Sequence, residues 1–526
     1  MKKKLVLLGL LPLVITSCSS QRSYLSIQQK KKVVISEIEK TVIQQHYKDY
    51  EEFAMPAKGD IKIAVIPIWF TDSPLNATNK VKVKHRIDDA FFGTPEKTGW
   101  HSVKSYYEEE SKGQFRLSGK TSQWYDYCGP SSDFYTKNET FLVNVTEWFF
   151  ATNPEEVRTD YDADNDGYLD CVSFIYGAWN YQNCGREKDN MWAYKSSLSN
   201  PVKNVNNPGL NTYFWASFDF LLDDEELIQN VTYNGHFSAE TFIHEFGHTF
   251  GLQDYYDYNS VYSPAGGFSM QDRNIGGHDP YSVMSIGWAD PYIPTESMEV
   301  QIGAFQKTHD LILLTPEWNE NDSSFDEYVL LELYTPTGLN EYHENNSDYG
   351  KYYHYTYPSE DKVGIRLWHV DARLTKRIDN FPNFPQWIYT TDLVTNVYDG
   401  DTVLAMSNTY YLEGGTQNSR CSPLGADYYN YNILECVQWN GELPYSYVND
   451  AYSQHLFVAK NGFTLSGRLP EYDEETDTYA YFINGNKQFL NNGKLNSGKD
   501  LGWSFMVESI TGEGDDAVAT IKLIKE

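Results

Sequence analysis

Runs of apolar residues alternate with residues of helical and strand periodicity in the first three hundred positions of the chain. From Ile61 to Phe70 nearly every residue is apolar, which predicts a buried strand. Asp170 to Gly177 predicts a second one. Helical spacing marks Ser102 to Glu110 and Thr140 to Phe150, and strand alternation marks Gln114 to Tyr127. The pattern therefore predicts a domain of mixed α and β structure.

The pattern changes beyond Met298. Short alternating segments such as Tyr328 to Leu333 and Trp503 to Val507 are separated by Asn, Gly and Pro turns, which is typical of an all-β region. We therefore expect an α+β protein, with one folded domain over residues 59–298 and a β-rich, sandwich-like region over residues 299–526. In the latter, residues 299–378 could pack on the first domain while residues 379–526 stand apart.

The first residues have the pattern of an export signal. Three lysines at positions 2–4 precede the apolar run Leu5 to Ile15, which is too short to span a bilayer. The ending Ile-Thr-Ser-Cys18 resembles the lipobox of bacterial lipoproteins. We predict a signal peptide over residues 1–17, lipid modification at Cys18, a tether or short pro-segment over residues 18–58, and an extracytoplasmic, membrane-anchored protein. A single cysteine near an ordinary signal is the alternative.

Charge and cysteine content exclude several classes of function. The formal net charge of -31 makes the surface repel nucleic-acid backbones, so no nucleic-acid partner is expected. Five cysteines follow Cys18, an odd number without a C-x-x-C pair. This argues against a disulfide framework or a thiolate metal site. The sequence does not indicate the oligomeric state.

The strongest chemical signal is the stretch T-F-I-H-E-F-G-H-T-F-G-L-Q-D-Y, residues 241–255. His244 and His248 are four apart, so their imidazoles lie on one face of a helix and can bind one Zn²⁺. Gly251 allows the helix to stop and the chain to turn, so that Asp254 can reach the metal as third ligand. Zinc would lower the pKa of a bound water to about 7. Glu245 would accept the proton of that water as general base.

The same stretch resembles the H-E-x-x-H-x-x-G-x-x-D motif of immune-inhibitor-A-like zinc metallopeptidases, a family of the metzincin clan. Ser102 to Phe115 resembles the family's helix and first hairpin, and Val363 to Asp371 its G-x-x-x-W-H-V-D strand. The resemblance implies a zincin-like catalytic domain, in which a mixed twisted sheet carries an active-site helix. It also implies protein or peptide substrates, and Asp254 as a zinc ligand or as a residue that orients a histidine.

The resemblance further implies a methionine turn beneath the metal. Met270 is favoured for this turn, because His278 to Trp288 resembles the family segment that follows it, and Met284 is the alternative. Neither methionine is followed two residues later by the Tyr of many metzincins. The oxyanion-stabilising group is therefore open, with three tyrosines nearby in sequence: Tyr255, Tyr256 and Tyr258.

A second cation site is predicted from D-x-D-x-D-G-x-x-D. Asp162, Asp164, Asp166 and Asp170 occupy loop positions 1, 3, 5 and 9 of a calcium loop, and the carbonyl of Tyr168 would serve at position 7. Ser173 stands at position 12, where a bidentate Glu is expected. We expect a structural Ca²⁺. The alternative is an acidic turn whose carboxylates accept backbone N–H groups.

Three other histidines, His236, His278 and His369, are expected to be structural. The favoured function is a lipid-anchored zinc endopeptidase whose substrate lies along an edge strand near residues 191–195. The alternative is a catalytically inactive surface-binding lipoprotein, an adhesin or glycan-binding protein that keeps a peptidase-like fold.

Overall fold

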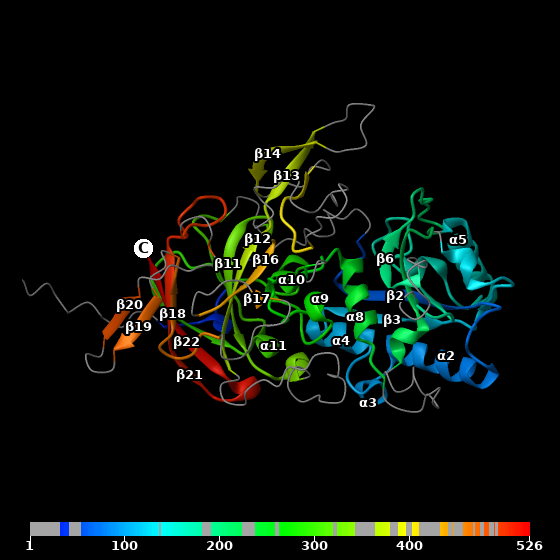
Figure 1. Cartoon of the computed structure of the whole chain (residues 1–526), viewed down its shortest axis with the longest axis horizontal. Helices are drawn as coiled ribbons and strands as arrows, with labels where there is room; N and C mark the ends of the chain where they lie inside the picture. Colours follow the sequence, from blue (N-terminus) through cyan, green and yellow to red (C-terminus); the bar gives the residue numbers. More distant parts are fainter. Residues whose placement is uncertain are drawn as a thin grey trace, which may run out of the picture.

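The computed structural model describes residues 32–41, 54–135, 138–180, 191–222, 237–257, 262–318, 323–341, 363–378, 388–395, 402–409, 432–439, 445–446, 456–465, 469–473, 478–482, 489 and 493–526. Helices and mixed sheets alternate in the first half, and strands dominate the second half (Figure 1). This is consistent with the predicted α+β class. Among the described residues, no helix has both the length and the apolar character needed to cross a membrane.

A six-stranded sheet organises the first half of the chain. Its order is β3-β2-β5-β7-β6, and β4 also pairs with β2. All pairs are parallel except β6 with β7, which is antiparallel. Strand β6 is the last in the order and therefore forms an edge of the sheet. The strands are β2 (Gly59–Trp69), β3 (Phe115–Thr121), β4 (Tyr125–Asp126), β5 (Val172–Tyr176), β6 (Tyr194–Ser197) and β7 (Thr212–Ser217).

Both faces of this sheet are covered by helices. Alternate residues of a strand point to opposite faces, and β2 divides its side chains in this way. Ile61, Ile63 and Val65 pack with α2 (Ala77–Phe92), α4 (Val103–Glu110) and α8 (Glu240–Gly247). Ile66 and Ile68 pack with α5 (Glu139–Thr152) on the other face. Burial on both faces explains the nearly continuous apolar run of this strand.

The second half contains two larger sheets. A five-stranded sheet has the order β1-β9-β22-β21-β18, and a four-stranded sheet has the order β10-β11-β12-β16. Their strands are β1 (Lys32–Val34), β9 (Met298–Gly303), β22 (Val518–Lys525), β21 (Trp503–Thr511), β18 (Gly462–Thr464), β10 (Ile312–Leu314), β11 (Glu327–Tyr334), β12 (Gly364–Asp371) and β16 (Leu434–Val437).

The four-stranded sheet is buried on both faces. In β11, Val329 and Leu331 belong to the hydrophobic cluster that includes the five-stranded sheet. Tyr328 and Leu330, the alternate residues, belong to the cluster that includes α4 and α8. Figure 1 shows β11, β12 and β16 between the five-stranded sheet and the helices. The four-stranded sheet therefore joins the two halves of the molecule through a continuous core.

Smaller elements complete the described chain. Three-stranded pairing joins β13 (Leu374–Ile378), β14 (Ile388–Val394) and β15 (Thr402–Leu404). Two-stranded pairings join β8 (Tyr262–Ser263) with β17 (Tyr445–Ser446), and β19 (Leu469–Asp473) with β20 (Thr478–Phe482). The short helices are α3 (Pro95–Thr98), α9 (Met270–Arg273), α10 (Pro280–Ser285) and α11 (Phe305–Thr308).

The segment before residue 58 also contributes to the core. Strand β1 pairs in parallel with β9, and the adjacent Ile35 is fully buried in the cluster of the five-stranded sheet. Lys40 forms an ion pair with Asp310 at 2.9 Å. Met55 is buried in the cluster that includes α4 and α8. Residues from the predicted tether therefore touch both halves of the protein.

Candidate metal centre

Helix α8 carries the two histidines and the glutamate of the H-E-x-x-H motif. It begins at Glu240, whose N–H donates to Ser238 Oγ at 3.1 Å, so Ser238 acts one residue before the N-cap, Ala239. A 3₁₀ turn over His248–Phe250 follows and ends at Gly251, where φ is +92°. This left-handed conformation favours glycine. It turns the chain so that Asp254 returns to the helix.

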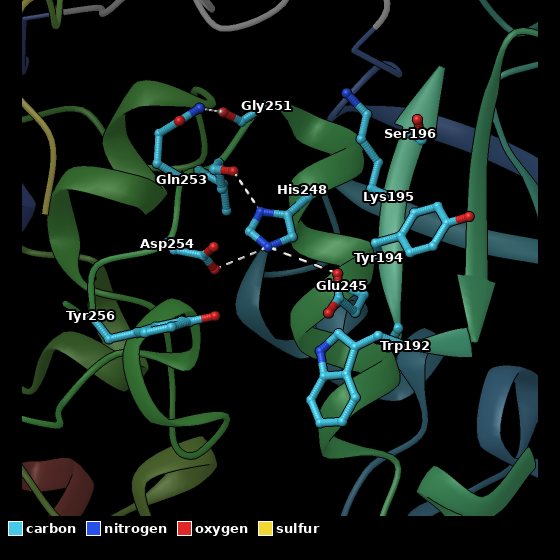
Figure 2. A pocket seen from close by; sticks show the side chains of 12 residues that line it. Trp192, Tyr194, Lys195, Ser196, Glu245, His248, Gly251, Gln253, Asp254 and Tyr256 are labelled. Atoms are coloured by element: carbon cyan, nitrogen blue, oxygen red, sulfur yellow. Dashed lines mark hydrogen bonds and ion pairs between the residues drawn. The ribbon is translucent and has the colours of Figure 1, made fainter. Parts of the chain in front are cut away.

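The structure brings His244, His248 and Asp254 together. Asp254 Oδ1 lies 3.0 Å from His244 Nε2 and 3.2 Å from His248 Nε2. One potential ligand atom from each residue lies within 4.8 Å of the others. Figure 2 shows His248 between Asp254 and Glu245. The two imidazoles and the carboxylate can therefore converge on one cation.

The second nitrogen of each histidine is held by a backbone carbonyl. His244 Nδ1 lies 2.9 Å from the oxygen of Met270, and His248 Nδ1 lies 2.8 Å from the oxygen of Leu252. Because a carbonyl only accepts hydrogen bonds, each Nδ1 carries a hydrogen, and in the neutral ring the lone pair is on Nε2. This is the tautomer that a metal-binding histidine needs. The donor set thus fits Zn²⁺, which prefers imidazole nitrogen and carboxylate oxygen in tetrahedral sites.

Electrostatic coupling within the cluster shifts the pKa of two of its members. Burial would lower the pKa of His248, but the carboxylate of Asp254 outweighs this effect and raises the pKa to about 9. Burial would raise the pKa of Asp254, but His248 and His244 hold it far below its ordinary value. Without metal, Asp254 and a protonated His248 therefore form an ion pair.

Glu245 lies beside the three candidate ligands without joining them. Its Oε2 is 4.0 Å from His248 Nε2, and its side chain lines a cavity. Burial raises the pKa of Glu245 above the ordinary value, although the two histidines oppose the shift. A carboxylate that faces a cavity next to a metal site, with its pKa moved toward neutrality, has the properties of a general base.

The cavity has a volume of about 490 Å³ and runs along the edge of the six-stranded sheet. Its walls include Glu245, His248, Asp254 and Tyr256 on one side and residues 192–196 on the other. Figure 2 shows β6 beside these residues. The strand begins at Tyr194, three residues later than the start of the predicted strand at Met191, and its outer edge faces the site.

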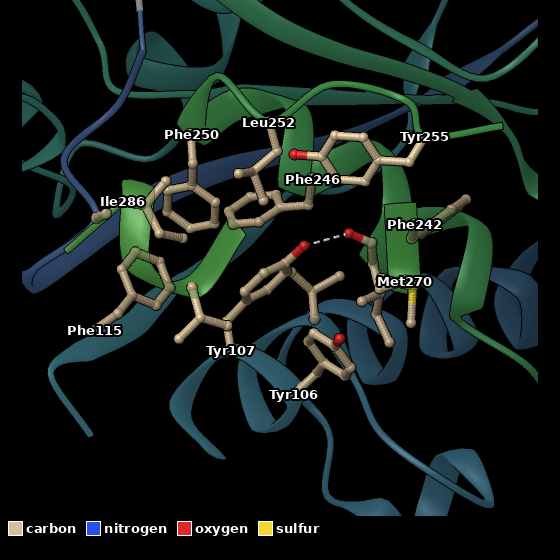
Figure 3. Packing of buried hydrophobic residues seen from close by; sticks show 14 of the residues in the cluster. Tyr106, Tyr107, Phe115, Phe242, Phe246, Phe250, Leu252, Tyr255, Met270 and Ile286 are labelled. Atoms are coloured by element: carbon tan, nitrogen blue, oxygen red, sulfur yellow. Dashed lines mark hydrogen bonds between the residues drawn. The ribbon is translucent and has the colours of Figure 1, made fainter. Parts of the chain in front are cut away.

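The methionine and tyrosine candidates occupy different positions. Met270 is fully buried in the hydrophobic cluster around α8 (Figure 3), and its carbonyl accepts the Nδ1 hydrogen of His244. Met284 is equally buried, in α10. Tyr255 is buried and its hydroxyl accepts a hydrogen bond from Ser282. Tyr256 lines the cavity, with its ring 6.2 Å from the ring of His244, whereas Tyr258 lies outside the described residues.

The acidic loop brings together three of its four aspartates. Ligand atoms of Asp162, Asp164 and Asp166 lie within 4.8 Å of one another, and Gly167 makes the turn with φ of +91°. These carboxylates also accept backbone hydrogen bonds, such as Gly167 N to Asp162 Oδ2 at 2.9 Å. The carboxylate of Asp170 accepts from Ala163 N at 3.0 Å. Tyr168, at loop position 7, donates its N–H to Asp166 Oδ1 at 2.8 Å.

The remaining predicted residues lie elsewhere. His369 is buried in β12 between two glutamates, and His278 is buried behind the metal centre. His236 and Cys18 lie outside the described residues. Sequence reasoning did not find the carbonyls of Met270 and Leu252, because a backbone acceptor has no residue signature. It also did not find Gln271, which reaches the site from α9.

Comparison with known proteins agrees with this geometry. Residues 80–271 match the family model for immune inhibitor A peptidase M6, catalytic domain. The chain is also similar to the Pre-pro-metalloprotease PrtV of Vibrio cholerae serotype O1, from strain M66-2 and from strain ATCC 39315 / El Tor Inaba N16961. Each is 23% identical over 241 residues, which is 39% of this chain and 25% of the relative.

The aligned part of the chain thus spans a quarter of the length of these relatives. The resemblance to immune-inhibitor-A-like metallopeptidases is confirmed for the matched segment, which contains the H-E-x-x-H helix and Asp254. The match supports a metalloprotease.

Proposed function

Because residues 80–271 form an immune-inhibitor-A-like peptidase segment, we propose that the protein is a zinc endopeptidase that hydrolyses peptide bonds of proteins. We assign His244, His248 and Asp254 as zinc ligands and Glu245 as general base. One observation carries the proposal: the Nε2 atoms of two histidines, whose Nδ1 atoms face backbone carbonyls, meet one carboxylate oxygen beside a buried glutamate that faces a cavity. We also propose that this zinc endopeptidase belongs to the metzincin clan.

Zinc at this site would supply a bound water that ionises near neutral pH and would polarise the substrate carbonyl. Glu245 accepts the proton of the attacking water. As the carbon–nitrogen bond breaks, it gives this proton to the leaving amine. The raised pKa of Glu245 suits both steps, because a base must hold the proton between them. An extended peptide would add antiparallel along β6, the edge strand that lines the cavity, and present its carbonyl at the metal.

The test replaces the proposed base. Glu245→Gln is expected to bind zinc as the wild type does and to cleave unfolded casein about 10²–10⁴-fold more slowly, since general acid–base catalysis supplies a factor of that size. Glu240→Gln is the matched control, because Glu240 lies in the first turn of the same helix. Casein cleavage and bound zinc are measured with and without a chelator.

Undiminished cleavage by Glu245→Gln would refute the general base. If the wild type shows no chelator-sensitive cleavage at all, the surface-binding lipoprotein becomes the better description.

We also propose that the acidic loop binds Ca²⁺ through Asp162, Asp164 and Asp166, with the Tyr168 carbonyl and Asp170 as further ligands. The close approach of three carboxylates around a glycine turn supports this proposal. Calcium, but not magnesium, should then raise the melting temperature of the wild type and leave that of Asp164→Ala, which lacks one ligand, nearly unchanged. If calcium raises the melting temperature of both proteins equally, the loop is an acidic turn whose carboxylates accept backbone N–H groups.

The location is a proposal from the sequence alone. The basic N-terminus, short apolar run and Cys18 support export and lipid attachment at the outer side of a bacterial membrane. Mass spectrometry of the mature N-terminus tests it, since a lipidated Cys18 must be the first residue.

A further inference from the structure

A chain of buried polar groups leads from His248 to helix α4. The side-chain amide of Gln271 lies between two imidazoles, with Nε2 3.4 Å from His248 Nδ1 and Oε1 3.3 Å from His278 Nε2. His278 Nδ1 lies 3.1 Å from the hydroxyl of Tyr106. The chain ends at the carbonyl of Gly276, which accepts from the Tyr106 hydroxyl at 2.9 Å. Gln271 and Tyr106 are fully buried, and His278 is 3% exposed.

The last acceptor in this chain fixes the proton on His278. A carbonyl cannot donate, so the single hydrogen of the Tyr106 hydroxyl points to Gly276. The lone pair of Tyr106 then faces His278 Nδ1, which must carry a hydrogen. Burial favours a neutral imidazole and lowers the pKa of His278 to about 3. His278 Nε2 is therefore an acceptor and needs a donor.

The same reasoning fixes the amide of Gln271. His248 Nδ1 carries a hydrogen, because the carbonyl of Leu252 accepts it. With the amide nitrogen toward His248, the NH₂ group of Gln271 would face the N–H at His248 Nδ1, which is also a donor. The amide oxygen would face the lone pair of His278 Nε2, which is also an acceptor. Rotating the amide by 180° keeps both contacts and pairs a donor with an acceptor in each. The amide oxygen then faces His248 and the NH₂ group faces His278.

We propose that Gln271 is a positioning residue of the metal centre: its amide oxygen accepts from His248 Nδ1, while His278 and Tyr106 hold the amide in that orientation. Gln271 would share the Nδ1 hydrogen with Leu252 and keep the Nε2 lone pair directed at the metal. This inference rests on the proposed zinc site. The three residues that hold His248 in this way come from separate segments: Tyr106 from α4, Gln271 from α9 and His278 from the loop before α10.

The glycine of the H-E-F-G-H stretch makes room for this amide. A Cβ on Gly247 would stand 2.4 Å from the side-chain oxygen of Gln271 as placed and 3.0 Å from the hydroxyl of Tyr107. The Tyr107 hydroxyl donates to the carbonyl of Ile243 at 2.6 Å and is held in place (Figure 3). Alanine at position 247 would therefore displace Gln271, although alanine is the better helix former.

The experiment compares zinc affinity in three full-length variants. Gln271→Met keeps the length of the side chain but cannot accept the hydrogen, so zinc should bind about 10-fold more weakly. Gln271→Glu, when its buried carboxyl is protonated, keeps an acceptor for His248 Nδ1 and a donor for His278 Nε2, so it should bind zinc more tightly than Gln271→Met. Gln301→Leu is the matched control, because it removes an amide that donates to Thr520 in the five-stranded sheet.

Zinc affinity is measured by competition with a chromophoric chelator, and the visible spectrum of the cobalt-substituted protein reports the ligand field. Gln271→Met should shift the cobalt bands, and Gln301→Leu should not. If Gln271→Met does not fold, Gly247→Ala provides the same test with Gln271 present, and it should also weaken zinc binding.

The outcomes separate the two proposals. A wild-type protein that binds no zinc refutes the proposed function, and this inference with it. If the wild type binds zinc and Gln271→Met binds it equally tightly with unchanged cobalt bands, only the role of Gln271 is refuted. The same holds if Gln271→Glu binds zinc as weakly as Gln271→Met, since the effect would then be one of packing.

Discussion

At the scale of single residues, His369 shows how a histidine outside the metal centre can be essential to the fold. Its Nε2 lies 3.0 Å from Glu327 and its Nδ1 lies 3.1 Å from Glu435, and the residue is 1% exposed. Both nitrogens face carboxylates, so both donate and the ring is a cation. Burial would lower the pKa of His369, but the two glutamates outweigh it and raise the pKa to about 10.

This arrangement predicts how stability depends on pH. The pKa of His369 is raised from 6.5, so its contribution is complete below pH 6.5 and is lost as the pH rises through about 10. Burial would raise the pKa of Glu327, but the hydrogen bond and charge of His369 outweigh burial and lower this pKa to about 2. The contribution of Glu327 to stability is therefore complete above pH 4.5 and is lost as the pH falls through about 2. The pair should therefore stabilise the protein most between about pH 4.5 and 6.5.

The measurement compares thermal unfolding of the wild type and His369→Gln from pH 5 to 10. The variant removes the cation that Glu327 and Glu435 share, and among the described residues only Glu327 keeps another, Arg373, at 3.7 Å, so the loss should cost about 3–5 kcal/mol near pH 6. The difference between the two proteins should shrink toward pH 10. His309→Gln is the control, because burial lowers the pKa of His309 to about 3 and the ring is neutral throughout. A pH-independent difference for His369→Gln would contradict the buried cation.

Single residues also show what a sequence can and cannot predict about the site. The spacing of His244 and His248 places them on one helical face, and Gly251 indicates the turn that returns Asp254. Gln271 gave no such signal. Its role depends on which groups α9 and α10 bring beside it after folding, and a glutamine has no preferred spacing to a metal-binding helix.

At the scale of elements, periodicity predicted the strongly patterned segments. The apolar run from Ile61 corresponds to β2, and the helical spacing from Ser102 corresponds to α4, which Ser102 caps through its side chain. Strands β11 and β12 were also predicted, within one or two residues at each end. These elements have one dominant period and clear ends, so local chemistry is sufficient to recognise them.

Two elements of the first half of the chain were not predicted. Helix α2 is the longest in the described chain, but its sequence A-T-N-K-V-K-V-K-H-R-I-D-D-A-F-F has a weak apolar face. Strand β7 is a fully buried run that adjoins an unpatterned loop. Edge strand β6 begins three residues later than expected, because pairing with β7 rather than composition determines its start. Tertiary contacts therefore decide where these elements lie.

At the scale of the whole molecule, the arrangement of sheets depends on contacts that sequence patterns do not specify. Alternation in β11 predicts one buried face and one exposed face, whereas all eight residues of the strand are buried. Nothing in the pattern indicates what covers each face. The structure places the five-stranded sheet against one face and the helices of the metal centre against the other. The N-terminal segment was expected to be a tether, whereas its strand β1 pairs with β9. Sequence patterns do not indicate this pairing, because the two strands are far apart along the chain.

That pairing predicts a stability effect far from the site. Ile35 is fully buried beside β9, so Ile35→Ala should lower the free energy of unfolding by about 2–5 kcal/mol through lost burial and a cavity. Val81→Ala is the control, since Val81 is 57% exposed in α2. Urea or thermal unfolding measures both. A cost below about 0.5 kcal/mol, the range of ordinary surface substitutions, would show that this segment does not share the core.

The place of β1 has a mechanical consequence. It forms three register pairs with β9 at the end of the five-stranded sheet. If a lipid on Cys18 anchors the protein, a force applied to that lipid would act first on β1, in the five-stranded sheet that also contains β22. The load would then reach the five-stranded sheet before it reached residue 54 and the helices around the candidate metal site.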